Sequence, residues 1–345
     1  MSDDIELYDE VDLIKKMTRD LKKSSSSLKK PEVRFLVDAY YRMQEKRIQY
    51  ASQIRTMKEF GEPHELLTWF FEQAHTLEKQ IAGALDAYSM SNKVGQWMRS
   101  IPGIGPVIAA GFMAHLDIAP WRCHNVALKG TKNLPCTAEK GACTDNCGHE
   151  PINYAGQWHT FAGLNPRIQW EKKTRRPWNT ALKTLCFKLG ESFVKVQNHK
   201  DDFYGQIFVE RKSQEWERNF NGENAKAAEL ALKKNIGKNT NAYKWYSGAV
   251  SSDWARSEWE SDKKGQKFGG ATLPKKAIVE DGTPMLPPAH IHARARRYVA
   301  KLFLFHLHQV MWEVEQGESP PPQAFFQDSE NIIEVPTVFP NSPFV

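Results

Sequence analysis

The chain is poor in the features that mark membrane-spanning and secreted proteins. None of its apolar runs reaches the roughly 18 residues that a transmembrane helix needs. Its first segment, "MSDDIELYDEVD", is acidic and lacks the apolar stretch of a signal peptide. Cysteine is scarce, with five among 345 residues, and four of the five lie within 25 residues of one another. We therefore expect a cytoplasmic protein with no membrane partner, in which clustered cysteines favour a metal over disulfides.

Strand signals are few and short, and internal repeats are lacking. Apolar residues recur instead at spacings of three and four from Pro31 to Lys93, as on one face of a helix. Gly61-Glu62-Pro63 separates two such helices. The fold class predicted is mainly α, with an N-terminal helical hairpin or coiled-coil arm and a second helical domain. An ordinary helical bundle is the alternative to such an arm. If the arm is present, we expect that the chain can form a homodimer through its N-terminal helices.

Changes in composition divide the chain into segments. Residues 213–288 are polar and rich in Gly, Ser, Lys and Trp, whereas residues 289–316 are strongly apolar with a basic start. We predict the following order: a flexible charged N-terminus (1–32), a helical arm (33–95), a helix-hairpin-helix domain (96–212) with a Cys-rich insertion (119–153), a polar Trp-rich insertion (213–288), a closing helix (289–316) and a Pro-rich tail (317–345).

Prolines and glycines interrupt a helical stretch at Pro102-Gly103-Ile104-Gly105-Pro106. One interpretation is an ordinary corner between two helices. The other is a helix-hairpin-helix, in which Gly103 and Gly105 have no Cβ and let a phosphate approach the backbone. A proline in the first turn starts the second helix, whose free amides and positive dipole end attract an anion. Ile104 would pack beneath the turn. Such a site holds a phosphate without reading base sequence.

Basic residues and tryptophans lie in a loop that we expect beside this hairpin. Five cations fall in a Pro-bounded stretch next to an indole, and these are predicted to contact phosphates: Arg167, Lys172, Lys173, Arg175 and Arg176, with Trp178 as the stacking group. Arg294 and Arg297 share a helix face and form a second candidate contact, the alternative being the solvated side of a core helix. The net charge of +6 is compatible with a polyanionic partner, DNA or a structured RNA.

Three motifs in this order resemble the C-terminal domain of the DEDD-type, bridge-RNA-guided insertion-sequence transposases. They are "SIPGIGPVIAAGFMAHLDI", "AGQWHTFAGLNP" and "KKTRRPWNTALKTL". In that family a helical arm leads to a Pro-Gly-(Ile/Val)-Gly hairpin, a helix ending in Ala-Gly-Leu-x-Pro, a basic loop and a helix opening with Asn. Ala162–Pro166 and Asn179 fill the last places here. The resemblance implies DNA binding by a transposase-like domain.

The catalytic parts of that family are missing from the sequence. Only about 95 residues precede the hairpin, and they have helical patterns rather than the strands of an N-terminal RNase-H-like domain. The family's nucleophilic serine follows Gly-Leu-x-Pro, but "RIQWEKKTRRPW" contains no serine and its one hydroxyl belongs to Thr174. No catalytic residue is assigned. We expect a chain that is catalytically silent on its own.

The Cys-rich insertion has the composition of a structural zinc site. Cys123, Cys136, Cys143 and Cys147 are separated by 12, 6 and 3 residues, and four thiolates satisfy tetrahedral zinc. His124 and His149 are alternative ligands. We therefore predict one structural zinc ion, with uncoordinated cysteines as the alternative.

Three other functions compete with DNA binding by a silent transposase-like domain. The first is that of a transposase or recombinase subunit whose catalytic domain is supplied by a partner. In the second the chain is a helix-hairpin-helix DNA glycosylase that uses Asp117. The third is a protein-interaction scaffold built on the arm and the Trp-rich insertion.

Overall fold

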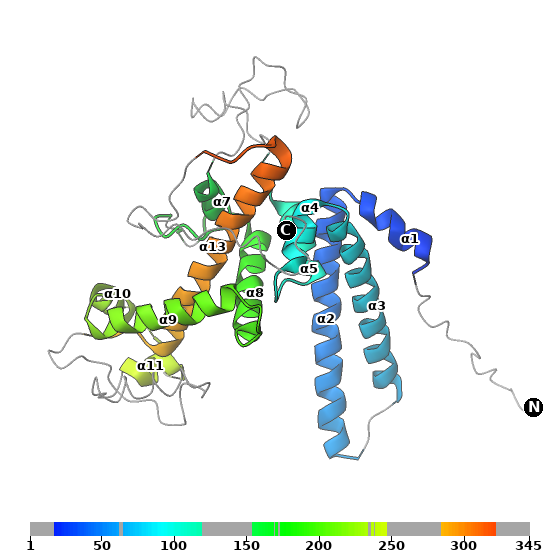
Figure 1. The fold of residues 1–345 in the computed structure, drawn as a ribbon. Helices are drawn as coiled ribbons and strands as arrows, with labels where there is room; N and C mark the ends of the chain where they lie inside the picture. The colour runs from blue at the N-terminus through cyan, green and yellow to red at the C-terminus, as the bar shows by residue number, and fades with distance from the viewer. Residues whose placement is uncertain are drawn as a thin grey trace, which may run out of the picture. The chain divides into compact units, whose positions relative to one another are not determined.

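A computed structural model describes residues 17–61, 65–118, 154–168, 170–171, 173–233, 236–237, 239–246 and 284–321. The predicted mainly α fold class is confirmed (Figure 1). The helices are α1 (Arg19–Ser24), η1 (Ser25–Ser27), α2 (Lys30–Glu59), α3 (Glu65–Met90), α4 (Lys93–Ser100), α5 (Pro106–His115), α7 (Ala155–Phe161), α8 (Thr180–Val196), α9 (Tyr204–Phe220), α10 (Ala225–Leu232), α11 (Asn241–Tyr246) and α13 (Pro288–Gln316). Among these described helices, none is both long and apolar enough to cross a membrane.

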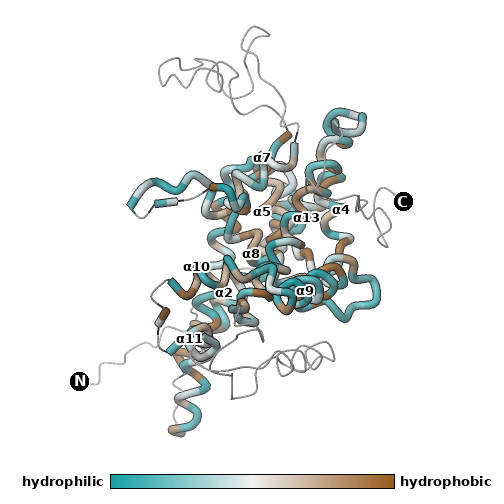
Figure 2. Tube along the Cα trace, turned by 90° about the vertical axis from the view of Figure 1, so that its left-hand side faces the viewer, coloured by the Kyte–Doolittle hydropathy of each residue, from teal (hydrophilic) through white to brown (hydrophobic). Residues whose placement is uncertain are grey.

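The chain divides into two compact units, and each is described by itself. The first unit comprises Met1–Gly163, Ile168–Leu185 and His306–Val345, and the second comprises Leu164–Arg167 and Cys186–Phe305. Helices α8 and α13 each contribute one part to either unit. Brown apolar and teal polar residues alternate along the described helices in Figure 2, as expected for helices with one buried face.

Helices α2 and α3 form the long two-helix arm of the first unit (Figure 1). Helix α2 begins with a capping interaction, since the backbone N–H of Lys29 donates to the Glu32 carboxylate over 2.7 Å. Aromatic packing joins the two helices further along, where the rings of Tyr50 and Phe70 stack with centroids 5.7 Å apart. An ion pair also joins the two helices: the Arg47 guanidinium of α2 donates to the nearly buried Glu78 carboxylate of α3 over 2.5 Å.

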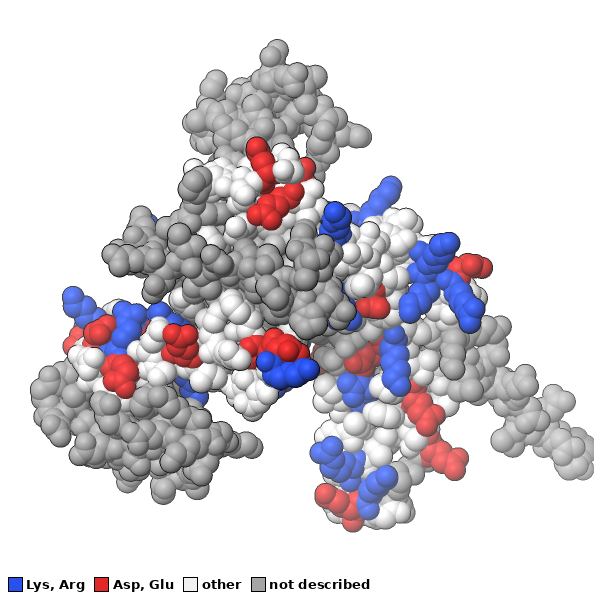
Figure 3. All heavy atoms as spheres, in the orientation of Figure 1, with Lys and Arg blue, Asp and Glu red and all other residues white. Residues whose placement is uncertain are grey.

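Large apolar side chains remain exposed on the arm. Phe60 is 81% exposed at the end of α2, Leu66 is 52% exposed at the start of α3, and Phe35 is 68% exposed. Basic and acidic side chains are mixed over the rest of the arm in Figure 3. The predicted homodimer through these helices stays a prediction.

Helix α5 occupies the core of the first unit and packs against α2, α3 and α4. Seven of its ten residues are buried, among them Phe112 and Ala110. Gly111 allows helix α8 to approach closely, because an added Cβ would lie 2.8 Å from a methyl group of Leu185. Helix α4, which leads into α5, begins at Asn92, whose side chain accepts a 2.7 Å hydrogen bond from the Val94 N–H.

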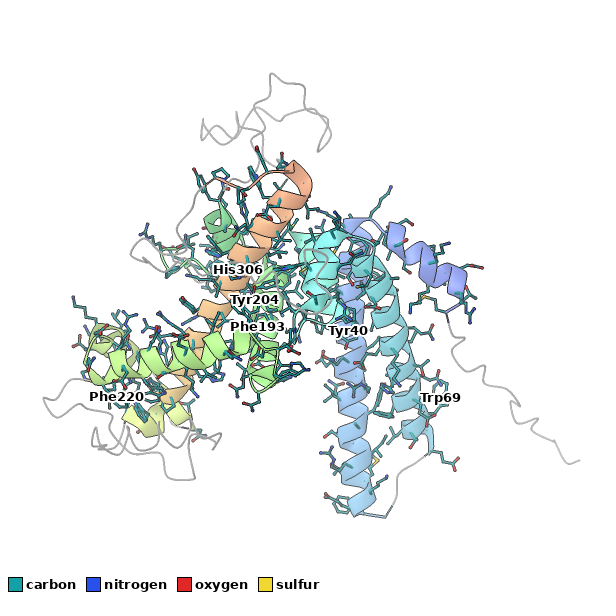
Figure 4. The ribbon with its side chains drawn as sticks, viewed as in Figure 1. Tyr40, Trp69, Phe193, Tyr204, Phe220 and His306 are labelled. Atoms are coloured by element: carbon teal, nitrogen blue, oxygen red, sulfur yellow. The ribbon has the colours of Figure 1, made fainter. Side chains whose placement is uncertain are left out.

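The second unit has a core of aromatic residues. The rings of Phe193 and Tyr204, both labelled in Figure 4, stack with centroids 4.6 Å apart. A second cluster buries Trp216, Trp245 and Met285, and the indole N–H of Trp245 donates to the Met285 carbonyl over 3.1 Å. Part of the segment 213–288, expected to be a polar insertion, thus contributes a core of its own, and α9 runs across the boundary expected at residue 213.

The buried ion pair of the arm makes the stability of the fold pH-dependent. Burial alone would raise the pKa of Glu78, but the hydrogen bond and charge of Arg47 outweigh burial and lower it. Because the folded pKa lies below that of the unfolded chain, this stabilisation is complete above about pH 4.3 and is lost as the pH falls through the folded pKa.

We expect Glu78→Gln to lower the free energy of unfolding by about 2 kcal/mol at pH 7, since Arg47 loses a charged hydrogen-bond partner. The difference from the parent should shrink as the pH falls toward 3. Urea unfolding followed by circular dichroism measures both. As a control, Glu223→Gln removes the exposed Arg218–Glu223 pair and should cost about 0.5 kcal/mol. Equal losses of unfolding free energy in the two variants would show that the buried Arg47–Glu78 pair stabilises the fold no more than an exposed pair does.

Candidate nucleic-acid interface

A tight turn of five residues joins α4 to α5. Gly103 has a φ of +89°, in the left-handed region that residues with a side chain rarely adopt. The Ile104 N–H donates to the Ile101 carbonyl over 3.1 Å, and both isoleucines are 2% exposed. The isoleucines therefore anchor the turn to the core while the two glycines stay nearer the surface.

The side chain of Arg99 holds this turn in place. One guanidinium nitrogen donates to the Ile104 carbonyl over 2.6 Å, and the guanidinium also pairs with Asp86 at 3.2 Å. Sequence reasoning missed this role, and the only available signal was a basic residue in the last turn of α4. This hydrogen bond and ion pair tie the turn to α4 and, through Asp86, to α3.

Gly105 differs from Gly103 because nothing in the described part of the structure requires a glycine there. Its φ of −81° and ψ of 171° suit any residue, and an added Cβ would meet nothing within 4 Å. It is the N-cap of α5, where Ser, Asn or Asp would stabilise the helix better. Pro106 follows in the first turn, and the amides of Val107 and Ile108 behind it have no partner inside the helix.

The basic loop exposes most of the cations predicted to bind phosphate. Lys173, Arg175 and Arg176 are exposed, while Lys172 lies outside the described residues. Lys173 has a φ of +74°. This backbone conformation is energetically unfavourable for any residue that carries a side chain. Trp178 is half-buried: its ring lies 4.0 Å from the Lys183 ammonium and 2.6 Å from where a Gly163 Cβ would lie.

Asn179 connects this loop to the C-terminal end of α5. Its backbone N–H donates to the Phe161 carbonyl over 2.8 Å, and its side chain caps α8 through the Leu182 N–H at 3.0 Å. Its amide nitrogen lies 3.3 Å from Nδ1 of His115, the last residue of α5. Burial, assisted by the charge of Arg34, lowers the pKa of His115 to about 4 and keeps the ring neutral near pH 7.

The loop is therefore anchored at the end of α5 that is opposite the hairpin. A ten-residue helix is about 15 Å long, so the base of the loop at Asn179 lies about that far from the hairpin, beside which the sequence predicted the loop. The hydrogen bonds of Asn179 also give a structural reason for an asparagine at this position of the motif.

Three other predicted contact residues belong to the second unit. Arg294 pairs with the buried carboxylate of Glu215 at 3.1 Å and donates to the Asn224 side chain over 2.7 Å. Arg211 also pairs with Glu215, at 2.5 Å, so Arg294 has a role in neutralising a buried charge. Arg297 is exposed, and Arg167 is exposed with its backbone N–H donating to Asn165.

The prediction of a structural zinc ion is corrected. Over the part of the chain that the structure describes, no three His, Cys, Asp or Glu side chains come together as a metal site requires. The one cysteine in that part, Cys186, is fully buried in α8, and burial raises the pKa of its thiol far above the range in which a thiolate forms. The predicted ligands Cys123, Cys136, Cys143 and Cys147, with His124 and His149, lie outside the described residues. No zinc is assigned.

The two candidate catalytic groups both have structural partners. The Asp117 carboxylate pairs with Lys30 at 2.8 Å, and Lys30 also donates to the Leu116 carbonyl over 3.0 Å. The Thr174 hydroxyl donates to the Glu171 carbonyl over 2.8 Å, which is the hydrogen bond of a turn and not of a nucleophile with a base.

Comparisons with protein-family models, with curated proteins and with solved structures find no match to this chain.

The two glycines of the hairpin should respond oppositely to substitution. Gly103→Ala forces a side chain into the left-handed region and is expected to lower the free energy of unfolding by about 1–2 kcal/mol. Gly105→Ser adds a good N-cap in open space and should leave stability unchanged or raise it by about 0.3 kcal/mol. Urea unfolding of both variants beside the parent tests this. A Gly103→Ala variant as stable as the parent would contradict the geometry of the turn.

Proposed function

We propose that this protein binds nucleic acid through its phosphate backbone, using the α4–α5 hairpin and the basic loop of residues 170–178. DNA is the proposed partner, with structured RNA as the other polyanion of the same chemistry. The resemblance of its motifs to the DEDD-type insertion-sequence transposases supports a domain that holds DNA. A cytoplasmic location remains part of the proposal.

The single observation that carries the proposal is the unexplained glycine at the start of α5. Gly103 is accounted for by its backbone conformation, but Gly105 has neither a restricted φ nor a crowded Cβ position. At an N-cap, where Ser, Asn or Asp would stabilise the helix better, a glycine that the described residues do not require is explained by a close approach from outside. The first free amides and the positive end of the helix dipole lie directly behind it, and they favour a phosphate as the approaching group.

The charge distribution of the loop supports the same partner. Lys173, Arg175 and Arg176 are exposed together, and Glu171 is the one carboxylate among the described residues of the loop. Arg294 and Arg296 of α13, by contrast, have carboxylate partners at Glu215 and Glu191. An exposed group of uncompensated cations costs little in water and gains on contact with phosphates, because counterions are released.

Catalysis by this chain alone is not part of the proposal. Among the described residues, the Thr174 hydroxyl bonds to the Glu171 carbonyl and the Asp117 carboxylate pairs with Lys30, so neither group gives support to strand transfer or to a glycosylase. A transposase or recombinase subunit that acts with a partner remains the alternative. Cleavage or joining of DNA by the purified chain with Mg²⁺, seen on denaturing gels, would favour that alternative.

The first test of the proposal is Gly105→Ser. The new hydroxyl would cap the amides and keep a phosphate away, so we expect about 10-fold weaker binding to a labelled 30-base-pair DNA, or about 1.4 kcal/mol. Fluorescence anisotropy at fixed salt is the measurement. Gly156→Ser is the matched control, because Gly156 also has open space around its Cβ position but lies in α7. Parental affinity in both variants would mean that the hairpin is only a corner.

The second test measures counterion release by the loop. Changing Lys173, Arg175 and Arg176 to Gln should flatten the slope of log affinity against log salt by about 2.7, at about 0.9 per phosphate contact on duplex DNA. A control variant with Arg55, Lys58 and Lys195 changed to Gln has the same net charge and loses exposed cations elsewhere. Equal slopes in the two triple variants would contradict contact by the loop.

A further inference from the structure

We propose that Trp170 is a stacking platform for an unpaired base, so that the preferred ligand carries a single-stranded or splayed segment next to the backbone that the hairpin holds. This inference rests on the proposed function and deepens it by naming the class of nucleic acid. Trp170 is 37% exposed, whereas Trp158, Trp216 and Trp245 are buried in the two cores.

The orientation of the Trp170 ring is fixed by the loop itself. Its indole N–H donates to the Thr174 carbonyl over 3.0 Å. The ring meets Trp178 edge to face, with centroids 6.4 Å apart and planes inclined by 64°. Because the polar edge of the indole is already used, the group that Trp170 offers to a ligand is the face of its ring.

The backbone beneath the ring is a tight turn. Both the N–H and the hydroxyl of Thr174 bond to the Glu171 carbonyl, over 3.2 and 2.8 Å, and Lys173 between them has a φ of +74°. These bonds hold Thr174, whose own carbonyl holds the indole. A ring that is already oriented loses little conformational freedom when a base stacks on it.

The two tryptophans of the loop have different tasks. Trp178 is half-buried, and its ring packs so closely on Gly163 that an added Cβ there would lie 2.6 Å from it, so this side of the ring is used within the protein. Trp170 is the more exposed of the two, and the Arg176 guanidinium lies over its ring at 5.4 Å from the centroid, so a base would stack on the part of the ring that Arg176 leaves open. An indole beside an arginine recognises a base and its phosphate together, the base by stacking and the phosphate by charge.

The pairing state of the ligand follows from this chemistry. In a duplex each base is stacked between its neighbours, and its π face is closed to a side chain unless the base is splayed out. In single strands, overhangs and loops the faces are open, and stacking on an aromatic ring tolerates any base. The ligand therefore combines a backbone for the cations and the hairpin with at least one unpaired base for Trp170.

The experiment compares three labelled DNA probes that share one sequence: a 20-nucleotide single strand, the blunt duplex, and the duplex with a single-stranded overhang. A single-stranded RNA of the same sequence distinguishes the two kinds of nucleic acid. We expect the full chain to prefer the probes with unpaired bases over the blunt duplex. Trp170→Leu should weaken binding to those probes by about 5- to 150-fold, the range of one lost base stack, and leave the blunt duplex within about two-fold.

Two variants make this result interpretable. Trp170→Tyr keeps an aromatic face and should restore most of the lost affinity. Phe187→Leu is the matched control, since Phe187 is 52% exposed and also lies under an arginine, Arg296, at 3.9 Å, but belongs to α8. It should bind every probe as the parent does.

Each outcome decides the inference. Equal affinity of the unmodified chain for paired and unpaired probes would overturn it without any variant, and so would equal losses on all probes in Trp170→Leu. In both cases salt-dependent binding would leave the proposed function standing. Absence of binding to every probe would instead overturn the proposed function.

Discussion

Helix α5 is buried on almost every side, and both parts of the candidate interface depend on that burial. Its middle residues pack against α2, α3 and α4, and Gly111 gives α8 room to approach. At one end its N-cap Gly105 faces open space, and at the other His115 lies against Asn179, which starts α8 after the basic loop. A helix clamped in this way cannot tilt independently of its neighbours. The hairpin and the base of the loop are therefore held about 15 Å apart, the length of ten helical residues.

Charge is treated differently in the core and on the loop. Glu78 and Glu215 are almost fully buried, and each has arginine partners at hydrogen-bond or ion-pair distance. These pairs avoid the large cost of a buried unpaired carboxylate and thereby fix the helices that carry them. The cations of the loop lie in water, where they cost little and stay available to a ligand. This contrast separates Arg294 from Arg175 and Arg176, although all three looked alike in the sequence.

Aromatic residues follow the same division. Trp158, Trp216 and Trp245 contribute apolar area to the cores, and the rings of Phe193 and Tyr204 stack between α8 and α9. Trp170 is held in place by a backbone carbonyl and leaves its ring exposed beside Arg176. An exposed indole buries little apolar area and so adds little to the stability of the fold, but its ring remains accessible for contact with a ligand. The proposed role of the loop in binding a charged, planar ligand rests on this exposed ring and on the cations beside it.

The sequence by itself determined the mainly α class, because helix formation leaves a local pattern of apolar residues at spacings of three and four. It also located the break at Gly61-Glu62-Pro63 between α2 and α3 and the turn at residues 102–105, since glycine and proline act on their own backbone.

The sequence could not separate the two glycines of that turn, which differ only in φ and in the space around them. It also could not assign Arg294 to Glu215 or Asn179 to His115, because those partners are 79 and 64 residues away along the chain. The prediction of zinc from cysteine spacing found no support in the described residues, among which no group of three possible metal ligands comes together. The spacing of cysteines along the chain does not fix the distances between their side chains. Local conformation was therefore decided by local residues, and the roles of the charged and aromatic side chains were decided only by the packing that brings distant helices together.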